Sequence, residues 1–413
     1  MRKKLEFQAD RIEAVLALHK VPARVTGGTV TPRWVRFQIL PAVGAKISKI
    51  KGLSEEMAAA LDASNCRVSR RGAAVAVEVP RDDPQPVRLL PLFRQLIEDD
   101  TSRSSRDSGG IPEVTAVLGL AEDGAPLLIR LPSPDVAHVL VAGSTGSGKT
   151  VLLQTMILSL AMANLPADGV QPLNPAEPCM SLVLMDPKGH ALGLFNQLPH
   201  LARPVVRDVG EMAEALQSLI RLMEGRSRSL ASAHVGEGDY GGNGLSASGQ
   251  PHVVVVIDEL ADVLMVGGKP VQHALTRLTQ RGREAGIHVV AATQKPSAAV
   301  LGPLIKANFP VRLVGRVSSA SDARTATGWS GTGAERLMGR GDFLAVAEGR
   351  VIRFQAAHVS TAEIQEVVAG LASSEWQGVD ERAKLPPGPG APLRSTLSSV
   401  GQLTEVFKGG MHR

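Results

Sequence analysis

Short apolar segments alternate with helix-patterned segments throughout residues 114–372. The apolar segments read AHVLVAG, SLVLMD, HVVVVIDE, HVVAAT and VRLVGRV, and valine or leucine dominates most of them. Strands that are apolar on both faces are typical of a parallel sheet covered by helices on each side. The alternation therefore predicts a doubly wound α/β fold with a mostly parallel sheet.

Polar, glycine-rich stretches divide the rest of the chain. Residues 99–113, DDTSRSSRDSGGIPE, have no apolar period, so we expect a flexible linker there. Residues 1–98 combine helix spacing with alternating segments such as RWVRFQIL, which predicts a small α+β domain. Glycine and serine crowd residues 224–250, where we expect a mobile excursion, and residues 373–413 are expected to form a Pro/Gly-rich tail.

Composition excludes several classes of protein. With 413 residues, 44% of them hydrophobic, the chain can bury a core. Cys66 and Cys179 stand far apart and outside any metal-ligand spacing, which favours a reducing compartment over a disulfide or zinc framework. No apolar run reaches the roughly 18–20 residues of a membrane span, so a cytoplasmic location is expected. A net charge of +5 fits a polyanionic partner, whereas 3% aromatic residues argue against stacking on single-stranded nucleic acid.

One glycine-rich loop lies between a predicted strand and a predicted helix, which is the context that a phosphate-binding loop requires. Glycines in such a loop let backbone N–H groups face a phosphate at a helix N-terminus. Lys149 is expected to neutralise the β- and γ-phosphate oxygens of ATP, and the Thr150 hydroxyl to ligate Mg²⁺. The residues that match GxxxxGK[ST] and are expected to bind the nucleotide are Gly143, Ser144, Thr145, Gly146, Ser147, Gly148, Lys149 and Thr150, followed by Val151.

Two carboxylates follow a second apolar strand. Asp258 and Glu259 end HVVVVIDE, and ligands bind at the carboxyl ends of strands in open α/β sheets. We expect Asp258 to hold the Mg²⁺-bound water and Glu259 to polarise the attacking water. The pair therefore predicts hydrolysis rather than phosphoryl transfer to a metabolite. Gln294 ends the next strand, where it can sense the γ-phosphate.

Longer stretches of the chain resemble a known family. Three of them resemble the motor domain of the FtsK/SpoIIIE family of double-stranded DNA translocases: LMDPKGHALGLFNQLPHLARPVVRD, VVVIDELADVLMVGGK and RGREAGIHVVAATQKPSAAVLGPLIKANFPVRLVGRVSSASDARTATGWSGTGAERLMGRGDFL. A fourth resembles the α domain of that family: VTPRWVRFQILPAVGAKISKIKGLSEEMAAAL. The resemblance implies a RecA-like P-loop NTPase motor at residues 114–372. It also implies a homohexameric ring that encircles double-stranded DNA and moves it by ATP hydrolysis.

The resemblance implies further site residues. Arg283, in RGREAGIH, falls where the family places an arginine finger that acts on the site of a neighbouring subunit. Lys295, Lys306 and Arg324 fall on or beside the loops that contact the DNA backbone. These three cations are the expected DNA-binding residues.

The chain also departs from the family pattern. Ala320 stands where the family usually has a lysine, which removes one phosphate contact per subunit, and Leu260 replaces a preferred phenylalanine. There is no N-terminal membrane segment and no room after residue 372 for a winged-helix domain, so we expect a soluble motor of a phage, plasmid or integrated element. Two alternatives stay open: a protein-secretion ATPase, and a switch ATPase that binds a partner without translocating it. A conjugative coupling protein is closer in mechanism to a DNA translocase than these two are, but such proteins are normally anchored in a membrane.

Overall fold

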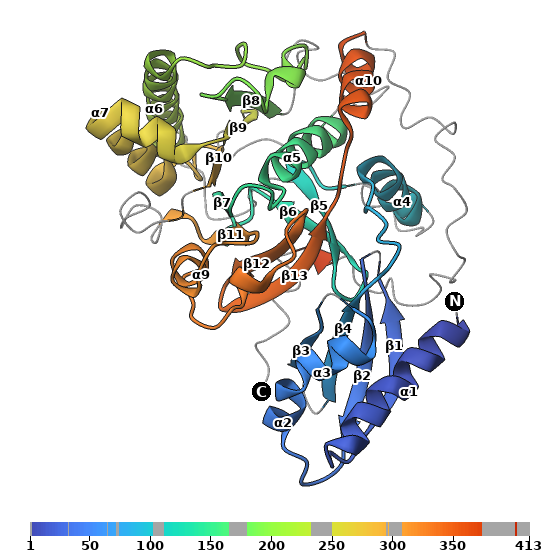
Figure 1. Ribbon diagram of the computed structural model, residues 1–413. Helices are drawn as coiled ribbons and strands as arrows, with labels where there is room; N and C mark the ends of the chain where they lie inside the picture. Colours follow the sequence, from blue (N-terminus) through green and yellow to red (C-terminus); the bar gives the residue numbers. More distant parts are fainter. Residues whose placement is uncertain are drawn as a thin grey trace. The chain divides into compact units, whose positions relative to one another are not determined.

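The computed structural model divides into two compact units, Met1–Val87 and Arg88–Arg413 (Figure 1). Each unit has its own core and is described by itself. The structure describes residues 2–31, 33–63, 65–71, 74–101, 111–164, 180–232, 250–294, 296, 308–373 and 401–402.

The first unit is an antiparallel sheet that packs helices on one face. Its elements are α1 (Arg2–Leu18), β1 (Ala23–Val30), β2 (Trp34–Pro41), α2 (Ile47–Gly52), α3 (Ser54–Ala60), β3 (Arg67–Arg71) and β4 (Ala74–Pro80). The strand order is β1-β2-β4-β3. Val35, Phe37 and Ile39 alternate along β2 and share one core with Ile12 and Leu16 of α1. This period of two places the apolar face of the sheet under the helices, which gives the expected α+β arrangement.

The second unit is built on one mixed sheet. Its strands are β5 (Thr115–Ala121), β6 (Pro126–Arg130), β7 (Val139–Ala142), β8 (Met180–Met185), β9 (His252–Ile257), β10 (Ile287–Thr293), β11 (Val311–Val314), β12 (Asp342–Ala347), β13 (Arg350–Ala356) and β14 (Gly401–Gln402). Among the described residues their order is β14-β6-β5-β13-β12-β11-β7-β10-β9-β8.

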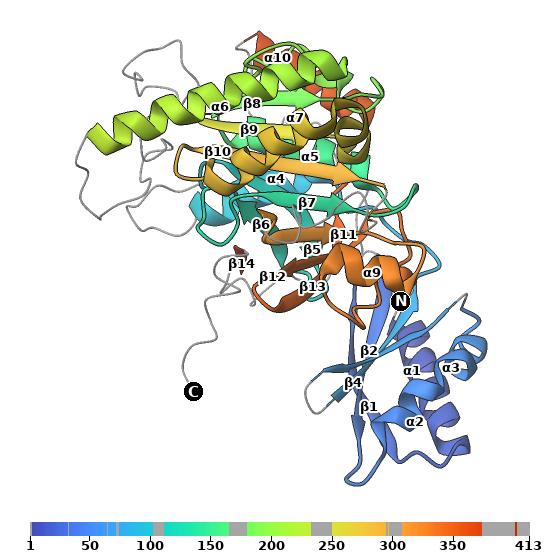
Figure 2. The ribbon, with the colours of Figure 1, turned by 90° about the vertical axis from the view of Figure 1, so that its left-hand side faces the viewer.

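Half of this sheet is the predicted parallel one. Figure 2 shows β8, β9, β10, β7 and β11 side by side, and each pairs with its neighbour in parallel. Every residue of β7, β9 and β10 is buried. Burial on both faces explains why these strands are continuously apolar rather than alternating.

The strands from β11 through β12, β13 and β5 to β6 pair antiparallel, which the sequence pattern did not lead us to expect, whereas β14 pairs with β6 in parallel. β12 and β13 form a hairpin whose turn residues, Glu348 and Gly349, have φ of 42° and 77°. Two positive φ values are the requirement of a two-residue turn that matches strand twist. β5 and β6 extend the sheet beyond β13, so the sheet as a whole is mixed.

Helices cover both faces of the parallel strands. The helices of the second unit are α4 (Leu89–Thr101), α5 (Lys149–Ala163), α6 (Val209–Ser232), α7 (Leu260–Arg281), α9 (Ala320–Thr327) and α10 (Thr361–Ala372), with short 3₁₀ turns η1 (Gly193–Phe195) and η2 (Ala334–Arg336). In Figure 1, α6 and α7 lie on one side of β9 and β10, and α5 lies on the other. Leu152, Ile157 and Leu160 of α5 are fully buried, as expected for an apolar helix enclosed by protein. The doubly wound α/β prediction is confirmed for this half.

Two predicted boundaries differ from the observed ones. The first division falls after Val87, because α4 belongs to the second unit: the Leu89 N–H donates to the His358 carbonyl O at 2.9 Å, and Leu89 is fully buried. Residues 224–232, expected to begin the excursion, instead continue α6. The remaining parts of the predicted linker, excursion and tail, 102–110, 233–249, 374–400 and 403–413, lie outside the described residues.

Candidate active site

The glycine-rich loop leaves β7 and enters α5 with a backbone that only glycine adopts easily. Gly143 has φ of 157° and Gly148 has φ of 103°. A Cβ at Gly143 would lie 2.7 Å from Ser147 Oγ, and a Cβ at Gly148 would lie 2.7 Å from the Gly341 N. Both glycines are therefore required by close approach as well as by conformation.

The Lys149 side chain folds back into this loop. Its Nζ donates to the carbonyl oxygens of Gly143 at 2.7 Å and Ser144 at 3.1 Å. Burial lowers the pKa of Lys149 to about 8, while Glu259 and Asp258 act to raise it. The ammonium therefore stays mostly protonated at neutral pH inside a loop of backbone amides. The backbone N–H groups of such a loop can donate to phosphate oxygens.

The two carboxylates lie at the carboxyl end of β9, as predicted. Burial, together with the nearby negative charges of Asp186 and Glu259, raises the pKa of Asp258 to about 6, although Lys188 and Lys149 act to lower it. Glu259 is 2% exposed and accepts from Thr293 Oγ1 at 2.8 Å. The site thus concentrates negative charge that a cation would relieve.

The donors present fit Mg²⁺. Thr150 is exposed in the first turn of α5, and Asp258 offers a partly buried carboxylate. Hard oxygen donors of this kind suit Mg²⁺, which keeps several waters and takes only one or two protein ligands. The described residues contain no cluster of three or more His, Cys, Asp or Glu able to enclose a metal.

Gln294 connects the loop to the acid. Its Oε1 accepts from Thr145 Oγ1 at 3.0 Å, and its backbone N–H donates to both oxygens of Glu259 at 3.2 and 3.1 Å. β10, which ends in Thr293, lies between β7 and β9 in the sheet. The structure therefore brings together Thr145, Gln294 and Glu259 from three different strand ends.

Two residues at the same edge were missed by the sequence reasoning. Asp186 follows β8, is fully buried, and accepts from the backbone N–H groups of Gly189, Ala191 and Leu192. Lys188 Nζ lies 3.6 Å from Glu259 Oε2 and 3.5 Å from Asp262 Oδ2. Although its slight burial acts to lower it, Glu259 and Asp262 raise the pKa of Lys188 above its ordinary value. The signal that could have found Asp186 is an acid at the end of an apolar strand, in SLVLMD, which is the signal used for Asp258.

Arg283 lies at the opposite edge of the sheet. It is exposed in the turn between α7 and β10, so it stands before β10, whereas the phosphate loop follows β7. β10 and β7 are parallel neighbours, and the residues of β10 span roughly 20 Å at about 3.3 Å per residue. Arg283 is thus too far away to reach the loop of its own chain.

The remaining predicted residues are only partly described. Arg324 is exposed on α9, whose N-cap Ser319 accepts from the Asp322 N–H, and Ala320 is exposed at the start of that helix. Leu260 is 1% exposed in the core under α7, which suits an apolar packing position. The predicted DNA contacts Lys295 and Lys306 lie outside the described residues.

Cys66 has the properties of an unreactive thiol. Cys66 is half-buried, and burial raises its thiol pKa to about 12, so little thiolate forms at neutral pH. Cys179 lies outside the described residues.

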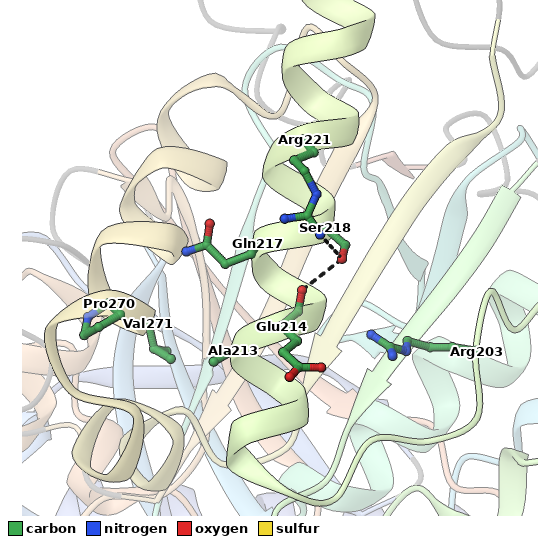
Figure 3. Close-up of a pocket in the computed structure, with 8 residues that line it drawn as sticks. All are labelled: Arg203, Ala213, Glu214, Gln217, Ser218, Arg221, Pro270 and Val271. Atoms are coloured by element: carbon green, nitrogen blue, oxygen red, sulfur yellow. Dashed lines mark hydrogen bonds between the residues drawn. The ribbon is translucent and has the colours of Figure 1, made fainter.

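A surface pocket between α6 and α7 lies away from the phosphate loop (Figure 3). Within it, Ser218 Oγ donates to the Glu214 carbonyl O at 3.0 Å and accepts from Arg221 Nη2 at 2.8 Å. None of the predicted site residues lines this pocket, so the pocket is not part of the candidate nucleotide site. Its lining residues are Arg203, Ala213, Glu214, Gln217, Ser218, Arg221, Pro270 and Val271.

The fold and the site together define a class of protein. A glycine-rich loop joins β7 to α5, a carboxylate pair ends β9, and β10 lies between these two strands. This is the arrangement of a RecA-like P-loop NTPase. Residues 110–298 match the model of the FtsK/SpoIIIE family, and residues 1–81 match the FtsK alpha domain. The chain belongs to the FtsK/SpoIIIE family.

Named relatives agree with this assignment. The DNA translocase FtsK of Sporosarcina ureae is 35% identical over 380 residues, covering 88% of this chain and 45% of the relative. The DNA translocase SpoIIIE of Bacillus subtilis is 32% identical over 381 residues, covering 89% of this chain and 45% of the relative. The chain therefore spans about half the length of the curated relatives it matches.

Solved structures share the fold. The conjugation coupling protein TcpA of pCW3 has a TM-score of 0.55 at 18% identity, covering 88% of this chain and 99% of that one. The cytoplasmic domain of the type VII secretion ATPase EccC of Thermomonospora curvata has a TM-score of 0.50 at 24% identity, covering 69% of this chain and 33% of that one. At these identities the likeness concerns the fold alone. Within the part of the chain that the structure describes, no helix is both long and apolar enough to span a bilayer.

Proposed function

We propose that this chain hydrolyses ATP at its phosphate loop and uses the energy to move double-stranded DNA through a homohexameric ring in the cytoplasm. The observation that carries the proposal is the hydrogen-bonded path from Thr145 through Gln294 to Glu259. It joins the phosphate loop to the end of β10, where the segment with two predicted DNA contacts begins. The relatives named DNA translocases support DNA as the cargo.

Each residue at the loop has one task in this proposal. Lys149 and the loop amides bind the β- and γ-phosphates, and Glu259 takes the proton of the attacking water. Thr150 and Asp258 would hold Mg²⁺, which would supply positive charge next to the phosphate oxygens. Thr293 and the Gln294 N–H fix the Glu259 carboxylate in position.

The position of Arg283 supports a ring. Because it lies at the far edge of the sheet from its own phosphate loop, it can stabilise transition-state charge only at the site of another subunit. A closed ring of identical subunits supplies each site with one such arginine. Hydrolysis per subunit is then expected to rise with protein concentration.

Coupling to DNA follows from chain connectivity. Lys295 comes directly after Gln294, so movement of Lys295 with the DNA backbone shifts the Gln294 N–H that holds Glu259. Lys295, Lys306 and Arg324 grip phosphates rather than bases, so binding is expected to be insensitive to sequence and to weaken steeply with salt. Ala320→Lys is expected to steepen the salt dependence by up to about one phosphate contact per engaged subunit.

The proposal is tested by measuring ATP hydrolysis under three conditions: without DNA, with linear duplex DNA and with covalently closed duplex DNA. We expect both duplexes to accelerate hydrolysis, and Arg324→Ala to reduce that acceleration more than Arg336→Ala, which replaces an arginine with an 84% exposed side chain. Hydrolysis that no duplex changes, in samples where rings form, would remove DNA as the cargo. A secretion or switch ATPase would then be the better account.

A further inference from the structure

The phosphate loop is braced from the side opposite β10. β11 runs parallel to β7, pairing Val311 with Val139 and Val314 with Ala142. The segment after β11 therefore leaves the same edge of the sheet as the loop. There the Arg316 carbonyl O accepts from Ser144 N at 2.7 Å and from Ser144 Oγ at 2.9 Å.

A second segment contacts the C-terminal part of the loop, at Gly146 and Ser147. The Arg340 N–H donates to the Gly146 carbonyl O at 3.0 Å, and the Gly341 N–H donates to the Ser147 carbonyl O at 2.8 Å. Gly339, Arg340 and Gly341 have φ of 72°, 50° and 89°. A left-handed arginine costs about 1–2 kcal/mol, so the surrounding contacts must hold this turn against the loop.

These two segments place the Arg316 side chain beside the loop. A Cβ at Gly339 would lie 3.1 Å from the Gly146 carbonyl O and 3.6 Å from Arg316 Cζ. The guanidinium therefore rests on Gly339, next to Gly146. A larger residue at Gly339 would push one of them away.

The Arg316 side chain has no partner of its own among the described residues. It is exposed, and no hydrogen bond or ion pair is formed by its guanidinium there. The carboxylates Asp258 and Glu259 follow β9, on the other side of β7 from β11. Asp342, which follows the Gly339–Gly341 turn in the sequence, pairs with Arg353, whose Nε lies 2.8 Å from Asp342 Oδ1. An unpaired guanidinium beside a phosphate loop has the charge and the planar donor fork that suit phosphate oxygens.

We infer that Arg316 is a nucleotide-binding residue, which contacts the phosphate oxygens of the bound nucleoside triphosphate from the side opposite Gln294. The inference rests on nucleotide binding by the loop in the proposed function and not on DNA movement. Lys149 approaches from within the loop, so the two cations bracket the phosphates. Because Ser144 bonds to the backbone oxygen of Arg316, replacing the side chain leaves that brace in place.

The test measures the affinity of the full chain for a fluorescent non-hydrolysable ATP analogue and for fluorescent ADP, without DNA. We expect Arg316→Ala to weaken binding of the triphosphate by about 10-fold, as for loss of one charged hydrogen bond, and Arg316→Lys to retain part of the affinity. Arg336→Ala, another exposed arginine of the same connection, is the matched control and is expected to stay within about twofold of the parent.

Two outcomes would overturn the inference. One is triphosphate affinity of Arg316→Ala within about twofold of the parent. The other is weaker DNA binding by Arg316→Ala with unchanged nucleotide affinity, which would make Arg316 a cargo contact. Thermal unfolding of each variant shows whether the fold is kept, and Arg316→Lys preserves the test if the alanine variant does not fold. If nucleotide binding depends on Arg316 but the parent protein does not translocate DNA, the result counts against the proposed function and not against this inference.

Discussion

The two edges of the parallel strands differ in how they treat polar groups. At the carboxyl edge, Lys149 and Glu259 keep charges in a buried or half-buried setting. At the amino edge, His252 Nδ1 lies 3.0 Å from His288 Nε2, and His288 Nδ1 lies 3.0 Å from the Ala137 carbonyl O. A carbonyl only accepts, so His288 Nδ1 donates, its Nε2 accepts, and His252 donates to it. These contacts fix the tautomer of His288, with its proton on Nδ1.

Burial keeps His138 and His288 at the amino edge neutral. It lowers the pKa of His138 to about 4 and the pKa of His288 well below its ordinary value. Arg226, 6% exposed, is the buried cation there, and it donates to the carbonyl oxygens of Ala285 and Pro251. The difference teaches that the carboxyl edge retains the charges that the proposed chemistry needs, while the far edge has neutral histidines and a backbone-bonded arginine that serve the fold. Arg283 is the exposed exception, because its proposed target lies on a neighbour.

The largest expected effect is at the carboxyl edge. Glu259→Gln is expected to keep nucleotide binding but lower the rate of ATP hydrolysis at least about 10³-fold, because the amide cannot take a proton from water. Lys149→Ala is expected to lose both binding and hydrolysis. Steady-state hydrolysis and fluorescent-nucleotide binding separate the two. Parental turnover by Glu259→Gln would show that another group is the base.

At the amino edge, Arg283→Ala is expected to lower hydrolysis by roughly 10²- to 10³-fold with nucleotide affinity unchanged, since one cation is lost from the transition state of the neighbouring site. Mixing this variant with Lys149→Ala is expected to restore some hydrolysis, because a few interfaces then contain both groups. Rings shown to be mixed that recover nothing would argue that Arg283 acts elsewhere.

The neutral histidines predict a smaller effect on stability. Between the ordinary histidine pKa of 6.5 and the lowered value of about 4 for His138, the unfolded chain binds more protons than the folded one. The free energy of unfolding therefore falls on acidification through this window, by roughly 2 kcal/mol at pH 5 for His138. Urea unfolding at pH 7 and pH 5 measures it.

His138→Asn is the informative variant for this measurement. Its Oδ1 can replace Nδ1 as acceptor for the Val289 N–H, and it does not titrate. We expect it to be less sensitive to acid than the parent, whereas His190→Asn, at an exposed position, is expected to match the parent. Equal acid sensitivity in all three proteins would mean that His138 is protonated without cost.

The smallest expected effect concerns the position of Glu259. Thr293→Val removes one hydrogen bond to its carboxylate but leaves the two from the Gln294 N–H. We expect kcat to fall about three- to tenfold with little change in KM, and Thr293→Ser to stay near the parent. A rise in KM with kcat unchanged would place Thr293 in substrate binding instead.

The carboxyl edge was largely predictable because its signals are local. The phosphate loop needs glycines at fixed spacing next to one strand and one helix, and Asp258 and Glu259 directly end an apolar strand. The position of Lys188 in the site was not predicted, because its partners, Glu259 and Asp262, come from a distant part of the sequence. Arg316 was not predicted as a site residue, because its place beside the loop depends on β11 pairing with β7.

The amino edge and the domain limits were not predictable for the same reason. Glycine and serine near residue 225 indicated a loop, yet α6 continues to Ser232. Arg226 anchors the helix there by donating to Ala285 and Pro251, contacts between segments far apart in sequence. Tertiary hydrogen bonds thus overrode local composition.

Displacement of a third strand from duplex DNA tests the central claim most directly. The parent protein with ATP and Mg²⁺ is expected to remove the third strand from a duplex with a free loading region, and Glu259→Gln is expected to leave it bound. Displacement that requires ATP turnover would establish movement along the duplex. A parent protein that forms rings and hydrolyses ATP but never displaces the strand would contradict the proposed translocation.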